Sequence, residues 1–285
     1  METVKLLSPA KVNLVLNVEG RRPDGYHDLD MVMAKISIYD EVSLSLKPEG
    51  VSLSCDNSDV PSGSENIAWK AASVLIEAKR LETGVHIHIE KNIPMGGGLG
   101  GGSADAATVL KGLNSLTGDR ATMGELMEIG LSLGADVPFF LFEGGAARAG
   151  GVGEVLSPIE DLPELWMVLI NPGVHVQTAA IFGRLNLGLT KNTKNHKIIR
   201  FNRDICQVVS LLHNDLESVT FNIYPEVEKA KDLLYRHGAA GALMSGSGST
   251  VFGIYSDKGA AQDSMAAIQN DLTAMGWKSF LAGAL

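Results

Sequence analysis

The stretch that most constrains the fold runs from Ile93 to Ala107 and reads IPMGGGLGGGSADAA. Six of the seven positions from Gly96 to Gly102 are glycine, so this backbone carries almost no Cβ atoms and several successive N–H groups can turn toward one anion. Apolar residues at helical spacing follow Ser103, which is a good N-cap residue. The stretch therefore predicts a phosphate-binding loop at the start of a helix that runs to about Leu116.

Two better-known phosphate-binding loops fit this stretch poorly. A P-loop ends in Gly-Lys-Ser or Gly-Lys-Thr, whereas no lysine follows Gly102. A Gly-x-Gly-x-x-Gly string can be read from Gly96 onward, but the dinucleotide-binding fold also needs an acid that ends a second parallel strand about 20 residues later. There this chain has the segment 117–119, after a helix. A flexible linker is the remaining alternative, and the adjoining apolar helix argues against it.

Composition indicates a globular enzyme with one large or two medium domains. The chain has 285 residues, of which 45% are hydrophobic and 20% charged, which is ample for a core. The net charge of -9 argues against nucleic acid held by a general basic field. Cys55 and Cys206 lie outside any Cys-x-x-Cys pattern, and the sequence shows neither a leader-like start nor a membrane-length apolar run. We expect a cytoplasmic protein that binds neither nucleic acid nor membrane.

A lysine and an amide stand close together in the first strand-like segment. Alternating apolar residues from Val4 to Val18 predict one or two strands, with a break around Ser8-Pro9-Ala10 because proline disfavours a strand interior. Lys11 and Asn13 lie in this break, and on an extended segment they would project to the same side. They either meet one ligand or form a solvated strand face.

A turn that carries an aromatic residue and a histidine comes next. The segment Arg22–Leu29 contains Pro-Asp-Gly, which is typical of a turn and would present Tyr26 and His27 together. Such a pair can stack on a nucleobase and hydrogen-bond to its edge. An exposed loop without a binding role fits this segment equally well.

Three further features are candidate functional elements. Asn66 ends a loop and caps a predicted helix of about 15 residues. Asp136 is the only charge between Glu128 and Glu143 and stands in an apolar setting, so it is either a helix-start residue or a functional carboxylate. The basic segment Thr190–Arg203 has no acid, and it is either a solvated loop or a lid over an anionic substrate.

The second half of the chain predicts a second domain. We place the boundary after residue 157, which gives domains 1–157 and 158–285. A strand near 166–170, helices near 204–219 and 225–237, and later strands suggest an α+β sandwich. The segment Ser245-Gly246-Ser247-Gly248 is a second glycine turn, able to approach the first one closely.

Three of these segments together resemble the motifs of the galactokinase, homoserine, mevalonate and phosphomevalonate (GHMP) kinase superfamily. They are Pro9–Asn13, the glycine stretch with Ser103, and Leu243–Gly248, in this order. Within the superfamily, three more segments resemble the family of kinases that phosphorylate 4-(cytidine 5′-diphospho)-2-C-methyl-D-erythritol in the non-mevalonate isoprenoid pathway. They are Arg22–Leu29, Gly134–Phe139 and Asn214–Glu217.

The resemblance implies a two-domain α+β fold, with an N-terminal mixed sheet and helices, a C-terminal ferredoxin-like sandwich, and the active site in the cleft between them. It implies transfer of the γ-phosphate of ATP to the 2-hydroxyl of this small-molecule substrate. Lys11 would stabilise the transferring group, and Asp136 would take or orient the hydroxyl proton. Magnesium is expected on the phosphates, and Ser103 is a possible ligand for it.

The resemblance also assigns binding residues. Those for ATP are Pro94, Met95, Gly96, Gly97, Gly98, Leu99, Gly100, Gly101, Gly102, Ser103 and Asn66. Those for the cytidine substrate are Asn13, Tyr26, His27, Thr178 and Phe182, and the third glycine motif is Ser245, Gly246, Ser247 and Gly248. Family members often carry a serine where this chain has Ala104, so contacts of that hydroxyl are absent or replaced. The alternatives are another GHMP small-molecule kinase, of the homoserine or mevalonate type, or a catalytically silent ligand-binding relative, in each case a monomer or homodimer.

Overall fold

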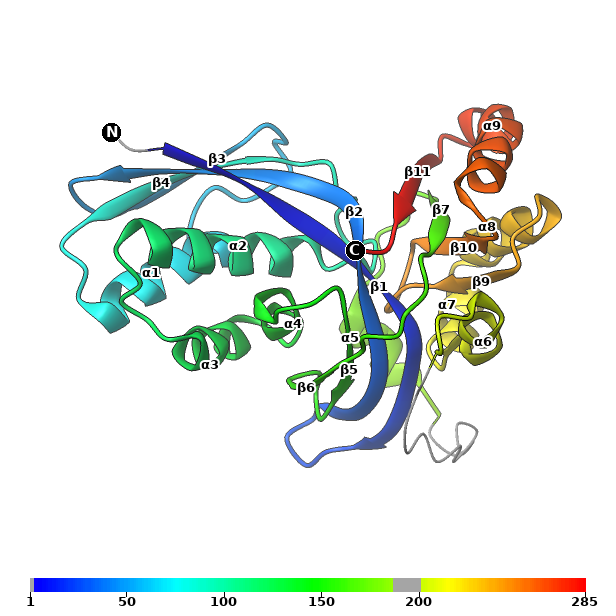
Figure 1. The fold of residues 1–285 in the computed structure, drawn as a ribbon, viewed down its shortest axis with the longest axis horizontal. Coiled ribbons are helices and arrows are strands. Elements are labelled where there is room, and N and C mark those ends of the chain that lie inside the picture. The colour runs from blue at the N-terminus through cyan, green and yellow to red at the C-terminus, as the bar shows by residue number, and fades with distance from the viewer. Residues whose placement is uncertain (1–2, 187–200) are drawn as a thin grey trace. The chain divides into compact units, whose positions relative to one another are not determined.

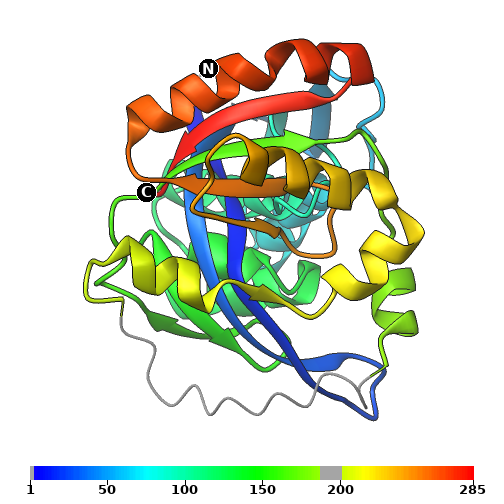
Figure 2. The ribbon, with the colours of Figure 1, turned by 90° about the vertical axis from the view of Figure 1, so that its right-hand side faces the viewer.

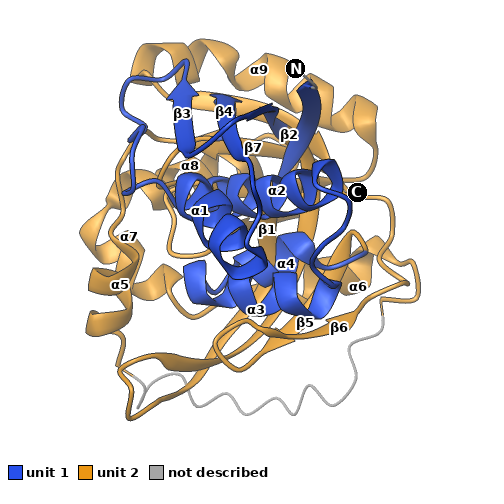
Figure 3. Ribbon diagram, turned by 90° about the vertical axis from the view of Figure 1, so that its left-hand side faces the viewer, with its two compact units in different colours: residues 1–10, 39–93, 100–143 blue, residues 11–38, 94–99, 144–285 orange. Residues whose placement is uncertain are grey.

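The computed structural model describes residues 3–186 and 201–285 (Figure 1). The prediction for the basic segment Thr190–Arg203 therefore falls almost entirely outside the described residues. The chain divides into two compact units, coloured separately in Figure 3. Unit 1 comprises Met1–Ala10, Tyr39–Ile93 and Gly100–Glu143, and unit 2 comprises Lys11–Ile38, Pro94–Leu99 and Gly144–Leu285.

These units do not follow a single cut in the sequence. The two long strands β1 (Thr3–Arg21) and β2 (His27–Lys47) each run through both units. The glycine stretch is also divided, because Pro94–Leu99 belongs to unit 2 and the chain from Gly100 onward to unit 1. The division into family domains after residue 157 is a different one, and it stays a prediction.

Unit 1 packs helices against a sheet. Its shorter strands β3 (Val51–Cys55) and β4 (Gly84–Glu90) run parallel to each other, and β4 pairs antiparallel with β2. Its helices are α1 (Ile67–Lys79), α2 (Gly101–Leu116), α3 (Met123–Leu133) and α4 (Val137–Leu141). Helices α1 and α2 pack on each other and on β4, while α3 and α4 pack on α2 (Figure 1).

Local sequence accounts for these helices. Asn66 is the N-cap of α1, as predicted, because its Oδ1 accepts a hydrogen bond of 2.9 Å from the Ala68 N–H. Thr122 and Glu125 form a capping box at the start of α3. Helix α2 ends at Leu116, where the apolar periodicity placed its end.

The predicted break around Pro9 is wrong, because β1 is continuous through this residue. The order of the larger sheet is β3-β4-β2-β1-β8; in addition, β5 (Ala146–Gly150) pairs with β2, and β6 (Val155–Pro158) pairs with β5. Strand β8 (His213–Asn214) pairs with β1 only at Val15 and Leu16. Pro9 lies outside this paired stretch, and an edge strand tolerates a residue without an N–H group.

Unit 2 contains a four-stranded antiparallel sheet with two helices on it. Its strands are β7 (Trp166–Asn171), β9 (Gly241–Met244), β10 (Val251–Tyr255) and β11 (Lys278–Gly283), in the order β11-β7-β10-β9. Helices α8 (Pro225–Arg236) and α9 (Lys258–Met275) lie on the face turned to the viewer in Figure 2. This is the ferredoxin-like β-α-β-β-α-β arrangement, which confirms the predicted sandwich.

The remaining elements of unit 2 connect its strands. They are β5 (Ala146–Gly150), β6 (Val155–Pro158), α5 (Thr178–Arg184), α6 (Ile205–Leu211), β8 and α7 (Glu217–Ile223). The single helix predicted over 204–219 is therefore wrong. Asn214 and Asp215 interrupt it, because their side chains bind backbone N–H groups. The side-chain Oδ1 of Asn214 accepts the Leu216 N–H at 2.9 Å, and the Asp215 carboxylate accepts the Val18 N–H at 2.7 Å.

Candidate active site

The glycine loop, Gly96–Gly102, has the backbone that an anion cradle needs. Gly96, Gly98 and Gly100 have φ angles of 62°, 76° and 71°, a region that residues with a Cβ rarely adopt. Helix α2 follows without a gap, so the N–H groups of its first turn have no partners inside the helix. The predicted combination of a glycine loop and a helix N-terminus is therefore present.

The N-cap position lies three residues earlier than predicted, at Gly100 rather than Ser103. The reason is the packing of Gly101, where an added Cβ would lie only 3.0 Å from Ile93 Cγ2. Without a Cβ, the backbone approaches Ile93 closely enough for the first turn to form inside the glycine run. Ser103 is consequently a residue of the first turn instead of its cap.

Within unit 2, the third glycine motif lies directly against the glycine loop. The Ser245 hydroxyl donates to the Gly98 carbonyl at 2.8 Å, and the Thr250 N–H donates to the Gly97 carbonyl at 3.1 Å. An added Cβ on Gly98 would lie 2.0 Å from the Ser245 carbonyl oxygen. The predicted close approach of the two glycine turns is confirmed, and it requires glycine at position 98.

Lys11 and Asn13 lie in the buried part of β1, with 4% and 1% of their surfaces exposed. The interpretation as a solvated strand face is therefore wrong. Lys11 Nζ donates to Asn13 Oδ1 at 2.6 Å, and the Lys11 N–H donates to the Leu99 carbonyl at 3.0 Å. The Asn13 N–H lies 3.3 Å from the Ser245 hydroxyl oxygen that accepts it. Both side chains are thus held next to residues of the two glycine turns.

The turn that follows β1 presents an aromatic surface. The imidazole of His27 and the ring of Phe182, on α5, face each other with centroids 5.1 Å apart and planes inclined by 30°. Tyr26 is 63% exposed, and its N–H donates to Asp24 Oδ1 at 3.0 Å. Unit 2 therefore brings His27 and Phe182, two of the five predicted substrate residues, into contact and leaves Tyr26 open to solvent.

Ion pairs hold this turn together, and partial burial changes the pKa of its histidine. Arg22 bridges Asp24 and Asp28, at 3.2 and 3.1 Å. Partial burial, and then the charge of Arg21, lower the pKa of His27 below its usual range. The imidazole is therefore neutral near pH 7, with one ring nitrogen as a donor and the other as an acceptor.

Thr178 links helix α5 to the third glycine motif. Its hydroxyl lies 2.8 Å from the hydroxyl of Ser247, and Thr178 is the first residue of α5, which also carries Phe182. One short helix thus supplies both of the predicted substrate residues from the second half of the chain.

Asp136 occupies the N-cap position of α4 in unit 1. Among the described residues, its carboxylate forms no capping bond to that helix, so the interpretation as a simple helix cap loses support. Lys111, on α2, helps to place α4 because its Nζ donates to the Phe140 carbonyl at 3.0 Å. An added Cβ on Gly134 would lie 3.8 Å from Ser103 Oγ, so the start of α2 and the turn before Asp136 are neighbours.

Sequence reasoning missed a buried charge cluster in unit 1, the charged triad of Asp40, Lys91 and Asp105. Lys91 Nζ pairs with Asp40 Oδ2 and, at 2.9 Å, with Asp105 Oδ2. Burial raises the pKa of Asp105 to about 7, against the attraction of Lys91 and with the help of Asp40. The available signal was weak: Asp105 is an acid on an otherwise apolar helix face, and its partners lie 14 and more positions away.

The residues present fit ATP better than they identify a metal site. The positive φ angles of Gly96, Gly98 and Gly100 suit a loop whose successive N–H groups turn toward one anion. Among residues 3–186 and 201–285, no three His, Cys, Asp or Glu side chains group in a way that could hold a metal ion. The hydroxyl of Ser103 is a protein oxygen near the helix start.

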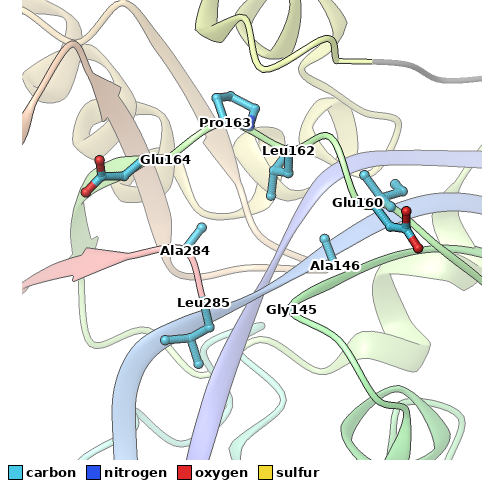
Figure 4. A pocket seen from close by; sticks show the side chains of 9 residues that line it. Gly145, Ala146, Glu160, Leu162, Pro163, Glu164, Ala284 and Leu285 are labelled. Carbon is cyan, nitrogen blue, oxygen red and sulfur yellow. The ribbon is translucent and has the colours of Figure 1, made fainter.

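A cavity of about 270 Å³ in unit 2 lies apart from all the predicted site residues (Figure 4). It is lined by Gly145, Ala146, Ile159, Glu160, Leu162, Pro163, Glu164, Ala284 and Leu285.

Within the described part of the chain, no helix is both long and apolar enough to cross a bilayer.

Comparison with known proteins decides the family. The model of the GHMP kinases N terminal domain matches residues 66–144, and that of the GHMP kinases C terminal matches residues 193–273. A 4-diphosphocytidyl-2-C-methyl-D-erythritol kinase of Geobacter metallireducens is 49% identical over 271 residues, which are 95% of each chain. The chain belongs to the GHMP kinase family.

Solved structures agree with this assignment. The crystal structure of a 4-(cytidine 5′-diphospho)-2C-methyl-D-erythritol kinase matches 99% of each chain, with a TM-score of 0.78 and 35% identity. A homoserine kinase from Cytophaga hutchinsonii matches 100% of this chain and 95% of its own, with a TM-score of 0.73 but only 21% identity. The second match shows a common fold and no more.

Proposed function

We propose that this GHMP kinase transfers the γ-phosphoryl group of ATP to the 2-hydroxyl of 4-(cytidine 5′-diphospho)-2-C-methyl-D-erythritol, a step of the non-mevalonate isoprenoid pathway. The observation that carries the proposal is the contact between the rings of His27 and Phe182, together with the exposed Tyr26, which precedes His27 in the chain. Aromatic rings beside a neutral imidazole suit a flat base with donors and acceptors on its edge. The names of the similar proteins specify a cytidine diphosphate substrate.

The glycine loop and the start of α2 are the proposed ATP site. Successive glycines and the helix N-terminus favour bound phosphate, and the third glycine motif supports the loop at Gly97 and Gly98. Magnesium, when bound with ATP, would neutralise phosphate charge, and Ser103 is its proposed protein ligand. Asn66 uses its side chain to cap α1, while its backbone N–H donates to the Gly63 carbonyl, and it stays a proposed contact of ATP.

Asp136 and Lys11 are the proposed catalytic residues. The substrate hydroxyl oxygen forms a bond to the γ-phosphorus while the bond from that phosphorus to the ADP oxygen breaks, and Asp136 takes the hydroxyl proton. Lys11 stabilises the negative charge on the transferring group. Its contact with Asn13 Oδ1 at 2.6 Å fixes the direction of the lysine. Phosphoryl transfer needs little beyond such positioning and charge stabilisation.

Further expectations complete the proposal. We place the family domains at 1–157 and 158–285 and expect a monomer or homodimer in the cytoplasm. The thiols of Cys55 and Cys206 are unbridged, which suits a reducing compartment.

The decisive experiment measures ADP formation with the cytidine substrate, homoserine and mevalonate, each at the same concentration. We expect turnover with the first alone. Asp136→Asn should lower kcat roughly 10²- to 10⁴-fold if the carboxylate accepts the proton, whereas Asp271→Asn, an exposed acid on α9, serves as the control that leaves kcat unchanged. Turnover of homoserine or mevalonate would favour the alternative kinases, and nucleotide binding without any turnover would favour a silent relative.

Tyr26→Ala tests the nucleobase site separately. Stacking on a base is worth about 1 to 3 kcal/mol, so the Michaelis constant for the cytidine substrate should rise roughly 5- to 150-fold. The constant for ATP should change little. Tyr26→Phe keeps the ring and should stay close to the parent protein. An equal rise in both constants would remove this turn from the nucleobase site.

A further inference from the structure

The segment Asn214–Glu217 has no task in the chemistry above, yet its side chains hold the third glycine motif. We propose that Asn214 is a positioning residue that fixes the turn 245–248 and, through it, the glycine loop that binds ATP. This inference rests on the proposed function for the identity of its nucleotide. All the residues concerned belong to unit 2.

The amide of Asn214 has both of its sides engaged. Its Nδ2 donates to the carbonyls of Met244 and Gly246, each at 2.8 Å, and its Oδ1 accepts the Leu216 N–H at 2.9 Å. Asn214 is only 5% exposed. Because both N–H groups and the carbonyl have partners, the orientation of this amide is determined. An acid of the same shape could not replace the two donors.

Two neighbours of Asn214 hold the same turn. Glu217 Oε1 accepts the Met244 N–H at 2.9 Å, and the Thr220 hydroxyl donates to the Ser247 carbonyl at 3.1 Å. The turn needs this support because Gly246 and Gly248 have φ angles of 57° and 90°. Such a backbone is one of several that glycine can adopt, so neighbouring side chains must select it.

The turn passes its position on to the glycine loop. The Ser245 hydroxyl donates to the Gly98 carbonyl at 2.8 Å, and the Thr250 N–H donates to the Gly97 carbonyl at 3.1 Å. The space for a Cβ on Gly98 is already taken by the Ser245 carbonyl. A change in the turn must therefore move Gly97 and Gly98, whose N–H groups belong to the proposed phosphate cradle.

A role in stability alone and a role in positioning give different results. If Asn214 only stabilised the fold, a variant that is folded at the assay temperature would bind nucleotide like the parent protein. If it positions the loop, the folded variant loses nucleotide affinity. The turn also contacts the proposed substrate residues Thr178 and Asn13, through Ser247 and Ser245. The Asn214 amide bonds Met244 and Gly246, on either side of the residue that supports the glycine loop, so we expect affinity for the cytidine substrate to fall less than affinity for nucleotide.

The test uses Asn214→Asp, which places oxygen where the amide nitrogen donates to two carbonyls. Calorimetry measures the Kd of adenylyl imidodiphosphate with magnesium, and steady-state kinetics measures both Michaelis constants and kcat. The variant loses the hydrogen bonds to the buried carbonyls of Met244 and Gly246. We therefore expect the Kd of the analogue and the Michaelis constant for ATP to rise roughly tenfold or more. We expect kcat to fall and the Michaelis constant for the cytidine substrate to rise by a smaller factor than the constant for ATP.

The matched control is Asn222→Asp. Asn222 is an exposed asparagine of α7 whose Nδ2 donates to the Ser218 carbonyl within the same helix, at 2.7 Å. It should leave every constant unchanged. If Asn214→Asp does not fold, Asn214→Ser removes the two donors without adding charge and is measured in the same way.

An unchanged Kd of the analogue in a folded Asn214 variant overturns the proposal, as does an equal loss of affinity for both substrates. The calorimetric measurement needs no acceptor alcohol. If the parent protein binds the analogue but does not turn over the cytidine substrate, the proposed function fails while the effect of Asn214 is still measured.

Discussion

The two ends of the glycine stretch are supported by opposite kinds of chemistry. In unit 1, the support is the charged triad of Asp40, Lys91 and Asp105, in which Lys91 precedes the glycine loop in sequence and Asp105 follows it. Asp40 Oδ1 also accepts the N–H groups of Asn92 and Ile93, at 2.6 and 2.8 Å. In unit 2, most of the support is neutral and comes from the amide network, formed by Asn214, Thr220 and the turn 245–248, while Glu217, paired with Lys231, accepts the Met244 N–H. The first support depends on charge balance, and the second depends on the direction of its donors.

This difference has an electrostatic consequence. The triad sets one cation against two carboxylates, all three nearly inaccessible to solvent, so it carries one excess negative charge when fully ionised. Burial of Asp105, which is only 3% exposed, makes its charged form costly. The amide network contains no such cost, because its buried donors and acceptors meet each other.

Lys91→Met should have the largest effect on stability. It leaves two buried carboxylates facing each other without a cation, and breaking a buried ion pair costs about 3 to 5 kcal/mol. Thermal unfolding should show a large fall in Tm, while Lys5→Met, which removes an exposed pair with Glu41, should lower it only slightly. Equal shifts for the two variants would mean that burial gives the triad no special weight.

Asp105→Asn should change how stability depends on pH. The pKa of Asp105 is about 7 in the folded state, against 3.8 without its surroundings. The folded state therefore binds a proton between these values, so the free energy of unfolding falls as pH rises from about 4 to about 7 and then levels off. Urea unfolding should show that the free energy of unfolding falls less between pH 5.5 and pH 8 in Asp105→Asn than in the parent protein.

The control for this titration is Asp257→Asn. Asp257 caps α9, and hydrogen bonds from the Ala260 N–H and the Ser256 side chain hold the pKa of its carboxyl below the usual range. It stays ionised over the whole interval, and asparagine is an equally good N-cap. The variant should keep the pH dependence of the parent protein, and a parent-like slope in Asp105→Asn would assign that slope to other groups.

The same comparison explains how far the sequence could predict the structure. The glycine loop and its helix follow from local composition, but the start of α2 depends on the contact of Gly101 with Ile93, which cap preferences do not contain. The predicted helix 204–219 fails because Asn214 uses its side chain on carbonyls 30 and 32 positions away. The charged triad joins residues up to 51 positions apart, and no local pattern indicates such a pairing.

Thr220→Val should have the smallest effect and refines the description of the amide network. Thr220 is fully buried, and its hydroxyl donates to the Ser247 carbonyl at 3.1 Å. Valine keeps the shape of the side chain and removes this donor, so unfolding should cost about 0.5 to 1.5 kcal/mol less, and the change should be independent of pH. That independence separates it from the triad, where the effect of Asp105→Asn varies between pH 5.5 and pH 8.

Thr220 supports the turn at Ser247, whereas Asn214 supports it at Met244 and Gly246, on either side of Ser245, whose hydroxyl contacts the glycine loop. Nucleotide affinity in Thr220→Val should therefore fall less than in Asn214→Asp. Unfolding in urea and calorimetry with the same ATP analogue measure the two effects in one variant. A loss of affinity as large as that of Asn214→Asp would mean that the whole turn moves as one body, and that its support is shared evenly along the chain.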